Sequence, residues 1–232
     1  MTETKAASVT VPAHLGIIMD GNRRWAKQHG QPTLNGHRQG LEALKDVALA
    51  AFERGVKVVS AFVFSTENWQ RTQEEVSFLM SLVSKGIDKH LATFDEAGIK
   101  LVMLGERRGI DKAILGTIDK AVAQTASNQI GTLALCFNYG GQDEIVQAAQ
   151  AAANSGSPIT IENLASHLYQ PQLPPIDFLI RTSGERRLSG FMLWRAAYSE
   201  LYFSDVLWPD FSANDLDIAL QAYAQRQRRF GA

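Results

Sequence analysis

The chain has 232 residues, a formal net charge of −1 and a hydrophobic content of 45%. This length and apolar content suit one domain with a sizeable core, and the balanced charge argues against a general nucleic-acid binder, so no nucleic-acid partner is expected. The single cysteine, Cys136, excludes an internal disulfide. No apolar run is long enough to span a membrane, and residues 1–13 lack the features of a targeting segment. These residues are expected to form a flexible tail before one domain at residues 14–232.

The first predicted element is a short buried strand at residues 15–19, which ends at Asp20 and Gly21 and leads into a helix. Apolar spacing predicts further helices at residues 36–54, 74–97, 111–125, 142–153, 160–169 and 212–229. Apolar and β-branched runs predict strands at residues 56–64, 99–104, 132–138 and 176–180. Strands and helices alternate, which predicts an α/β fold with a mostly parallel central sheet and helices on both faces.

Three polar clusters follow predicted strands, at residues 20–25, 65–69 and 181–189. Because ligands bind beyond the carboxyl ends of strands in open α/β sheets, the clusters are expected to meet at one edge. In the first cluster, arginines favour an anion and Asp20 favours a cation, which indicates a phosphorylated ligand with a metal nearby. The alternative is a tight turn with a solvated Asp and Arg pair, and this stretch alone does not separate the two.

The cluster at residues 181–189 is the richest in phosphate-binding groups. Its three arginines can bind phosphate oxygens bidentately, and its hydroxyl groups add further donors. The alternative is a solvated basic loop, but the apolar run at residues 191–194 is expected to hold the loop against the core.

Two other features allow both a structural and a functional interpretation. Ser65 or Thr66 can line a site or cap the helix that follows. Glu200 lies among apolar residues, where a carboxylate needs a partner; that partner is either an arginine or a Mg²⁺ ion shared with Asp20. The phosphate-binding motifs GxxxxGK[ST] and GxGxxG are absent.

Several separated motifs resemble those of the cis-prenyltransferases, the undecaprenyl diphosphate synthase family. They are HLGIIMDGNRRWA, GHRQG, FSTENWQR with EEV, NYGG, IRTSGERRLSGFMLW, AYSELYF, WPDF and RRFG, which together span residues 14–231. The resemblance implies the fold of that family, with a hydrophobic tunnel walled in part by the helix at residues 74–97. It implies condensation of isopentenyl diphosphate with an allylic diphosphate such as farnesyl diphosphate, with Mg²⁺ as cofactor. The expected product is a cis-polyprenyl diphosphate such as undecaprenyl diphosphate, a lipid-carrier precursor for cell-wall glycan synthesis.

The resemblance also implies roles for residues at matching motif positions. Asp20 is expected to act on Mg²⁺ and the leaving diphosphate, and Glu200 to complete the Mg²⁺ site. Asn68 is the family's candidate proton acceptor, but a neutral amide is a weak base, so on physical grounds Asn68 is a positioning residue and the departing diphosphate can take the proton. The expected residues of the allylic substrate site are Gly21, Asn22, Arg23, Arg24, Trp25, Thr33, His37, Ser65, Thr66, Glu67, Trp69 and Arg71. Those expected to bind isopentenyl diphosphate are Arg181, Arg186, Arg187, Leu188 and Ser189.

The chain departs from the family pattern at a few positions. Thr33 stands where an arginine is frequent, so one diphosphate contact is weaker or comes from elsewhere, for example from Arg23. Thr72, Gly190 and Arg195 also differ, which leaves the preferred allylic substrate open. Two alternatives remain, a relative with short or branched products and a non-catalytic partner subunit. The family implies a cytoplasmic homodimer that contacts the membrane through its lipid product.

Overall fold

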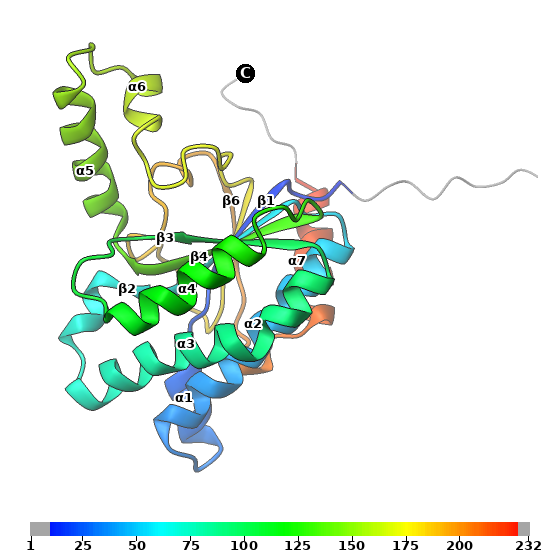
Figure 1. Cartoon of the computed structure of the whole chain (residues 1–232). Coiled ribbons are helices and arrows are strands. Elements are labelled where there is room, and N and C mark those ends of the chain that lie inside the picture. The colour runs from blue at the N-terminus through cyan, green and yellow to red at the C-terminus, as the bar shows by residue number, and fades with distance from the viewer. Residues whose placement is uncertain (1–9, 227–232) are drawn as a thin grey trace, which may run out of the picture.

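The structure, a computed structural model, describes residues 10–226 and is built on a six-stranded sheet (Figure 1). The strands are β1 (His14–Ile18), β2 (Val58–Ser65), β3 (Ile99–Leu104), β4 (Gly131–Tyr139), β5 (Phe178–Arg181) and β6 (Glu200–Phe203). They lie in the order β3-β4-β2-β1-β5-β6, and every pairing is parallel. The prediction of an α/β fold with a mostly parallel sheet is confirmed, although β6 was not among the predicted strands.

The helices follow the predicted order, with ends that differ by a few residues. In the described range they are α1 (Asn22–Gln28), α2 (Thr33–Glu53), α3 (Gln73–Glu96), α4 (Lys112–Gln124), α5 (Gly141–Asn154), α6 (Ile161–Ala165) and α7 (Ala213–Ala224), with short 3-10 helices η1 (Thr66–Gln70) and η2 (Trp208–Asp210). The first nine residues of the expected tail, the end of the last predicted helix and the RRFG motif lie outside the described residues. Between residues 10 and 226, no helix is long and apolar enough to cross a membrane.

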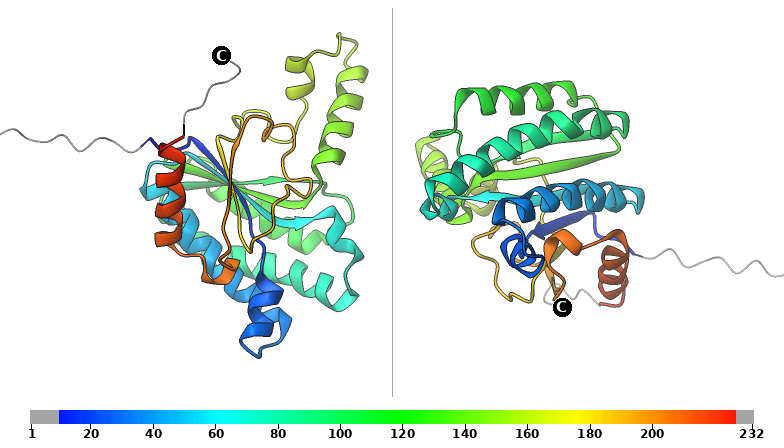
Figure 2. Two further views of the ribbon diagram at one scale, coloured as in Figure 1. Left: turned by 180° about the vertical axis from the view of Figure 1, so that it is seen from behind. Right: turned by 90° about the horizontal axis from the view of Figure 1, so that it is seen from below.

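The two faces of the sheet are covered differently (Figure 2). On one face, Leu15 and Ile17 of β1 belong to a core shared with α2, α3, α4 and α7. On the other face, Ile18 packs in a second core with Ile176 and Phe191, which lie outside regular helices. Successive strand residues alternate between the two faces, as the pleat requires. Helices therefore dominate one layer, while a largely irregular segment between α6 and β6 forms much of the other.

Two adjoining apolar cavities lie between α2, α3 and the sheet. Their volumes are about 40 and 60 Å³, and both are lined by Leu41, Leu44, Val63 and Val83. The second cavity also reaches Asn22 and His37. Apolar cavities therefore lie beside the helix that was expected to wall a tunnel, but they are small in this structure.

Candidate active site

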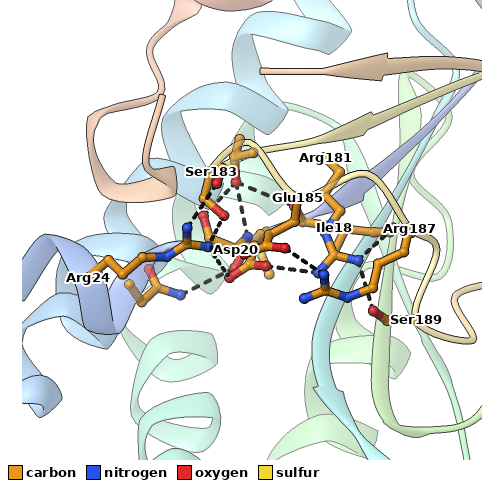
Figure 3. Close-up of polar contacts among 11 residues, drawn as sticks. Ile18, Asp20, Arg24, Arg181, Ser183, Glu185, Arg187 and Ser189 are labelled. Atoms are coloured by element: carbon orange, nitrogen blue, oxygen red, sulfur yellow. Dashed lines mark hydrogen bonds and ion pairs between the residues drawn. The ribbon is translucent and has the colours of Figure 1, made fainter. Parts of the chain in front are cut away.

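Asp20 lies just beyond the carboxyl end of β1, between two arginines (Figure 3). Its Oδ2 accepts a hydrogen bond from the Arg181 guanidinium at 2.8 Å, and its Oδ1 lies 3.5 Å from the Arg24 guanidinium. The Thr182 hydroxyl fixes the Asp20 backbone, because it accepts from the Asp20 amide at 3.0 Å and donates to the Asp20 carbonyl at 2.6 Å. Asp20 therefore pairs with the buried Arg181 as well as with the partly exposed Arg24, and the alternative of a solvated Asp and Arg pair accounts only for the second contact.

Glycines bring α1 close to its neighbours. Gly21 has a φ of +113°, and a Cβ there would lie 3.1 Å from the Leu207 backbone, so this position requires glycine. In α2, a Cβ at Gly36 would lie 2.0 Å from the Asn22 carbonyl oxygen. Because only a glycine allows this approach, α1 and the arginines it carries are fixed against α2.

Arg24 connects the first polar cluster to the loop after β5. Its guanidinium donates to the Ser183 carbonyl at 3.0 Å and to the Ser183 hydroxyl at 2.5 Å. It also lies 3.2 Å from the Glu185 carboxylate. Ser183 and Gly184 both have positive φ, so the loop turns sharply where it meets Arg24. Segments about 160 residues apart in the sequence thus share one polar network.

Arg181 is almost fully buried at the end of β5. Its guanidinium donates to the Arg187 carbonyl at 2.5 Å and to the Ser189 hydroxyl at 2.8 Å. Its Nε is buried and has no hydrogen-bond partner. Such an unsatisfied buried donor is costly, and it marks Arg181 as a side chain held in place by its other contacts, while the residue also lines a polar pocket.

Two polar pockets meet at Asp20. One, of about 380 Å³, is lined by Met19, Asp20, Gly21, Asn22, Arg23, Arg24, His37 and Arg71; we call it the Arg24 pocket. The other, of about 340 Å³, is lined by Ile18, Met19, Asp20, Asn22, His37, Phe62, Val63, Ser65, Asn68, Arg71, Leu79, Arg181, Arg187 and Ser189; we call it the Arg181 pocket. Asn22 and His37 line both and also reach the apolar cavity. Members of all three predicted clusters therefore lie together, as two cationic pockets beside an apolar one.

Glu75 of α3, which belongs to the EEV motif but was assigned no role from sequence, gathers cationic groups beside these pockets. Its carboxylate lies 2.9 Å from Arg71, 3.2 Å from His37 Nε2 and 4.0 Å from Arg23. Burial opposes ionisation of Glu75, but its neighbours outweigh burial and hold the pKa of this carboxyl below its usual range. Burial lowers the pKa of His37, and the hydrogen bond to Glu75 only partly offsets this.

The cluster after β2 forms the 3-10 helix η1, and Ser65 caps it. The Ser65 side chain accepts from the backbone of Asn68, while the Asn68 Oδ1 accepts from the Ser65 amide at 3.0 Å. Ser65 therefore caps η1, a 3-10 helix that was not predicted, whereas Thr72 caps α3, the helix that was predicted to follow; Ser65 also lines the Arg181 pocket. The side-chain oxygen of Asn68 accepts from the Ser65 backbone, so the side-chain NH2 group of Asn68 is left to donate hydrogen bonds.

Some predicted site residues line neither polar pocket: Trp25, Thr33, Thr66, Glu67, Trp69, Arg186 and Leu188. Two of them have structural contacts instead. The Trp25 indole donates to Asp210 at 2.6 Å, and the Trp69 indole donates to the Asn138 side chain at 2.7 Å. These tryptophans hold the elements that carry Arg24 and Asn68.

Glu200 does not lie near Asp20 in this chain. The register aligns Glu200 with Phe178 and Leu15 near the amino ends of their strands, whereas Asp20 follows the carboxyl end of β1. The Glu200 carboxylate pairs with Arg226 at 2.9 Å. The arginine partner considered from sequence is therefore present, and the two carboxylates do not form a shared metal site within one chain.

The predicted Mg²⁺ ion can be tested against the donors present. No group of three or more His, Cys, Asp or Glu side chains within residues 10–226 is arranged to hold a metal. Mg²⁺ is, however, often bound by one or two carboxylates together with substrate phosphates. Asp20, which lines both polar pockets, fits such a site when diphosphate oxygens complete it.

Residues 18–231 match the family model described as undecaprenyl diphosphate synthase. The chain belongs to this family. An isoprenyl transferase of Lactococcus lactis subsp. lactis is 45% identical over an alignment of 236 positions, which covers 99% of this chain and 97% of the relative. Membership of this family makes the chain a prenyltransferase enzyme. The family that the sequence motifs resemble is therefore confirmed.

Solved structures agree with the fold of an undecaprenyl diphosphate synthase. Lavandulyl diphosphate synthase from Lavandula x intermedia, crystallised with dimethylallyl diphosphate, has a TM-score of 0.92 at 31% identity and covers 96% of this chain and 99% of its own. A probable undecaprenyl diphosphate synthase from Campylobacter jejuni has a TM-score of 0.83 at 27% identity, over 96% and 100% of the two chains. The names of these relatives indicate different products on one fold.

Proposed function

We propose that the enzyme joins isopentenyl diphosphate to an allylic diphosphate, forms a cis double bond in each cycle and releases diphosphate. The observation that carries this proposal is the meeting of two cationic pockets at Asp20, beside an apolar cavity. Two diphosphate groups need two cationic pockets, and a prenyl chain needs an apolar one. Family membership of the chain supports the same reaction.

In this proposal the Arg24 pocket holds the allylic diphosphate. Arg23, Arg24, His37 and Arg71 line it, and they offer several donors to one anion. Thr33, which stands where the family often has an arginine, lies outside the pocket. Arg23 is exposed and lines the pocket, so in this proposal it supplies the diphosphate contact that an arginine at position 33 would make.

The Arg181 pocket then holds isopentenyl diphosphate. Arg181, Arg187 and Ser189 line it, and their guanidinium and hydroxyl groups provide donors for phosphate oxygens. Leu188 and Arg186 lie on the same loop and need not contact the substrate.

During the reaction, the allylic C–O bond breaks, a C–C bond forms to isopentenyl diphosphate, and one proton leaves the new chain. The arginines of the Arg24 pocket stabilise the negative charge that develops on the leaving diphosphate. A Mg²⁺ ion bound by Asp20 would supply further charge stabilisation there. Asn68, whose oxygen is engaged by Ser65, orients substrate through its amide donors, and the released diphosphate takes the proton.

The apolar cavities support repeated elongation, since they continue from the pockets between α2 and α3. Farnesyl diphosphate is the proposed starter, and undecaprenyl diphosphate, the lipid-carrier precursor, is the proposed product, because the matching family carries that name. The second candidate is a single condensation to a short or branched product, which the likeness to lavandulyl diphosphate synthase favours.

The assembly proposed for the enzyme is a cytoplasmic homodimer of one catalytic domain, residues 14–232, preceded by a short tail. Its lipid product gives it contact with the membrane surface. Exposed apolar side chains on α5 and α6 support the dimer, and they are considered in the Discussion.

The proposal is tested by incubating the purified protein with Mg²⁺, farnesyl diphosphate and labelled isopentenyl diphosphate, then measuring product length. We expect labelled cis-polyprenyl products, and Asp20→Ala is expected to lower kcat by at least about 100-fold while circular dichroism stays unchanged. Products of one condensation would favour the short-chain candidate. An inactive wild-type protein that gains activity with a partner would favour the non-catalytic alternative, and near-normal turnover by the variant would refute the role of Asp20.

A further inference from the structure

Glu185 lies between an arginine of each polar pocket, and neither motif nor spacing assigns it a role. One carboxylate oxygen lies 3.2 Å from the Arg24 guanidinium, and the other accepts from the Arg187 guanidinium at 2.5 Å (Figure 3). Arg24 lines one pocket and Arg187 lines the other. A single carboxylate therefore connects the cationic groups of both pockets.

This contact closes a ring of polar interactions. The order around the ring is Arg187, Glu185, Arg24, Asp20 and Arg181, and the Arg181 guanidinium then donates to the Arg187 carbonyl at 2.5 Å. Three guanidinium groups alternate with two carboxylates, so the ring carries a net charge of +1. Among the described residues, only Glu185 links the side chains of Arg187 and Arg24. Removal of Glu185 therefore opens the ring between these two arginines.

Glu185 contacts these arginines from outside the pockets. It lines neither the Arg24 pocket nor the Arg181 pocket, and its side chain is 31% exposed. A guanidinium has five donors, so Arg187 can keep its contact with Glu185 while it binds an anion on the pocket side. Glu185 is therefore placed to hold the arginines and does not occupy the space of a substrate.

Arg187 depends on this contact more than Arg24 does. The Arg187 side chain is 60% exposed, and among residues 10–226 its guanidinium pairs only with Glu185. Arg24, in contrast, is also held by both oxygens of Ser183 and by Asp20. A long exposed side chain loses rotamer freedom when it binds a ligand, and a contact that restricts it beforehand lowers that loss.

We propose that Glu185 is a positioning residue that bridges Arg24 and Arg187 and so holds the two diphosphate sites in register. This inference rests on the proposed function, because it takes the two pockets as the sites of the two substrates. The bridge needs both carboxylate oxygens and the full length of the glutamate side chain.

The experiment compares steady-state constants for both substrates in wild type, Glu185→Gln and Glu185→Asp. Glutamine removes the charge at the same size, and aspartate keeps the charge but is too short to reach both arginines. We expect each variant to raise KM for isopentenyl diphosphate about three- to fivefold, the effect of losing a partly exposed ion pair, with kcat within about twofold of wild type. In an Arg187→Gln background, Glu185→Gln is expected to change KM by less than about twofold, because the charged partner of Glu185 at position 187 is already gone.

Asp205→Asn is the matched control. Asp205 is exposed, lies beside the same turn at Gly184 and lines neither polar pocket. The Asp205→Asn substitution removes one negative charge beside the same turn. The KM values for isopentenyl diphosphate and for the allylic diphosphate are expected to stay at the wild-type level.

Three outcomes would overturn the inference while wild type remains active. A lower KM in Glu185→Gln would mean that Glu185 competes with substrate for the arginines. A wild-type KM in Glu185→Asp would mean that charge alone matters and the bridge does not. Unchanged KM values in both variants, with or without a lower melting temperature, would leave Glu185 a purely structural residue. An inactive wild-type protein would instead contradict the proposed function itself.

Discussion

His14 at the start of β1 is a buried histidine held in a fixed orientation. Its Nδ1 lies 2.8 Å from the Pro174 carbonyl and its Nε2 lies 2.8 Å from the Ser60 hydroxyl, so Nδ1 carries the hydrogen and Nε2 accepts. Burial lowers the pKa of His14 to about 4, from 6.5. The unfolded chain therefore binds a proton between pH 6.5 and about 4 that the folded chain excludes, and the free energy of unfolding falls as pH falls through this window.

The size of this effect is on the order of 3 kcal/mol, from the difference between the two pKa values. Urea unfolding at pH 7.5 and pH 4.5 measures it, with His14→Gln as the comparison, since glutamine does not titrate. Carboxylates also lose stabilising contacts in acid, so the informative quantity is the difference in pH dependence between the two proteins. We expect a weaker dependence in the variant, and parallel curves would contradict the assignment to His14.

Single residues also show what the sequence can predict. Asp20 and Arg187 follow buried strands and Arg181 ends one, and the ends of parallel strands meet, so their convergence could be predicted. Glu75 and Glu185 lie within the motifs EEV and IRTSGERRLSGFMLW, but no role could be assigned to them, because an acidic residue at a helix start or in a loop has a solvated surface role in most proteins. Their partners lie on other elements, and only the folded chain shows which groups meet.

At the scale of elements, Gly86 of α3 controls how closely α3 approaches α2. A Cβ at Gly86 would lie 2.5 Å from the Leu41 side chain, and both residues line the apolar cavity of about 40 Å³. A larger side chain at this position fills the space that a growing chain would enter. Gly86→Leu is therefore expected to shorten the products by several isoprene units while the rate of the first condensation stays within about threefold of wild type.

Product length after the same incubation measures this effect. The control is Gly116→Leu in α4, where an added Cβ meets nothing within 4 Å and the helix gains propensity in the same way. We expect wild-type product length from the control. Full-length products from Gly86→Leu would mean that the growing chain does not pass between α2 and α3.

Elements with strong periodicity could be predicted, and irregular ones could not. The helix predicted at residues 74–97 is α3 (Gln73–Glu96), because its apolar spacing continues over many turns. β6 has only four residues, all half-buried at the edge of the sheet, so it gives a weak pattern. The irregular layer that includes Phe191 has no periodicity, and Arg195 holds it by a buried ion pair with Glu144 at 2.9 Å.

At the scale of the whole molecule, the active site depends on the parallel sheet. β1 and β5 are neighbours in the sheet although about 160 residues separate them in the sequence. Their carboxyl ends place Asp20 beside Arg181, and no local segment contains both halves of the site. Sequence motifs could predict the members of this site, whereas the tertiary fold decides the pairing, and it leaves Glu200 at the other end of the sheet.

The proposed homodimer makes a prediction about α5 and α6, which project from the body of the molecule (Figure 1). Val146 on α5 and Ile161 on α6 are 68% and 70% exposed, and the two helices contact each other, so we expect their exposed apolar side chains to lie in the interface. Light scattering after size exclusion is expected to show a dimer for wild type and a monomer for Val146→Glu with Ile161→Glu, because charges buried at an interface are costly. Ile218→Glu on α7, also an exposed isoleucine, is the control and should remain dimeric. A wild-type monomer would refute the dimer, and a dimeric double variant would place its interface elsewhere.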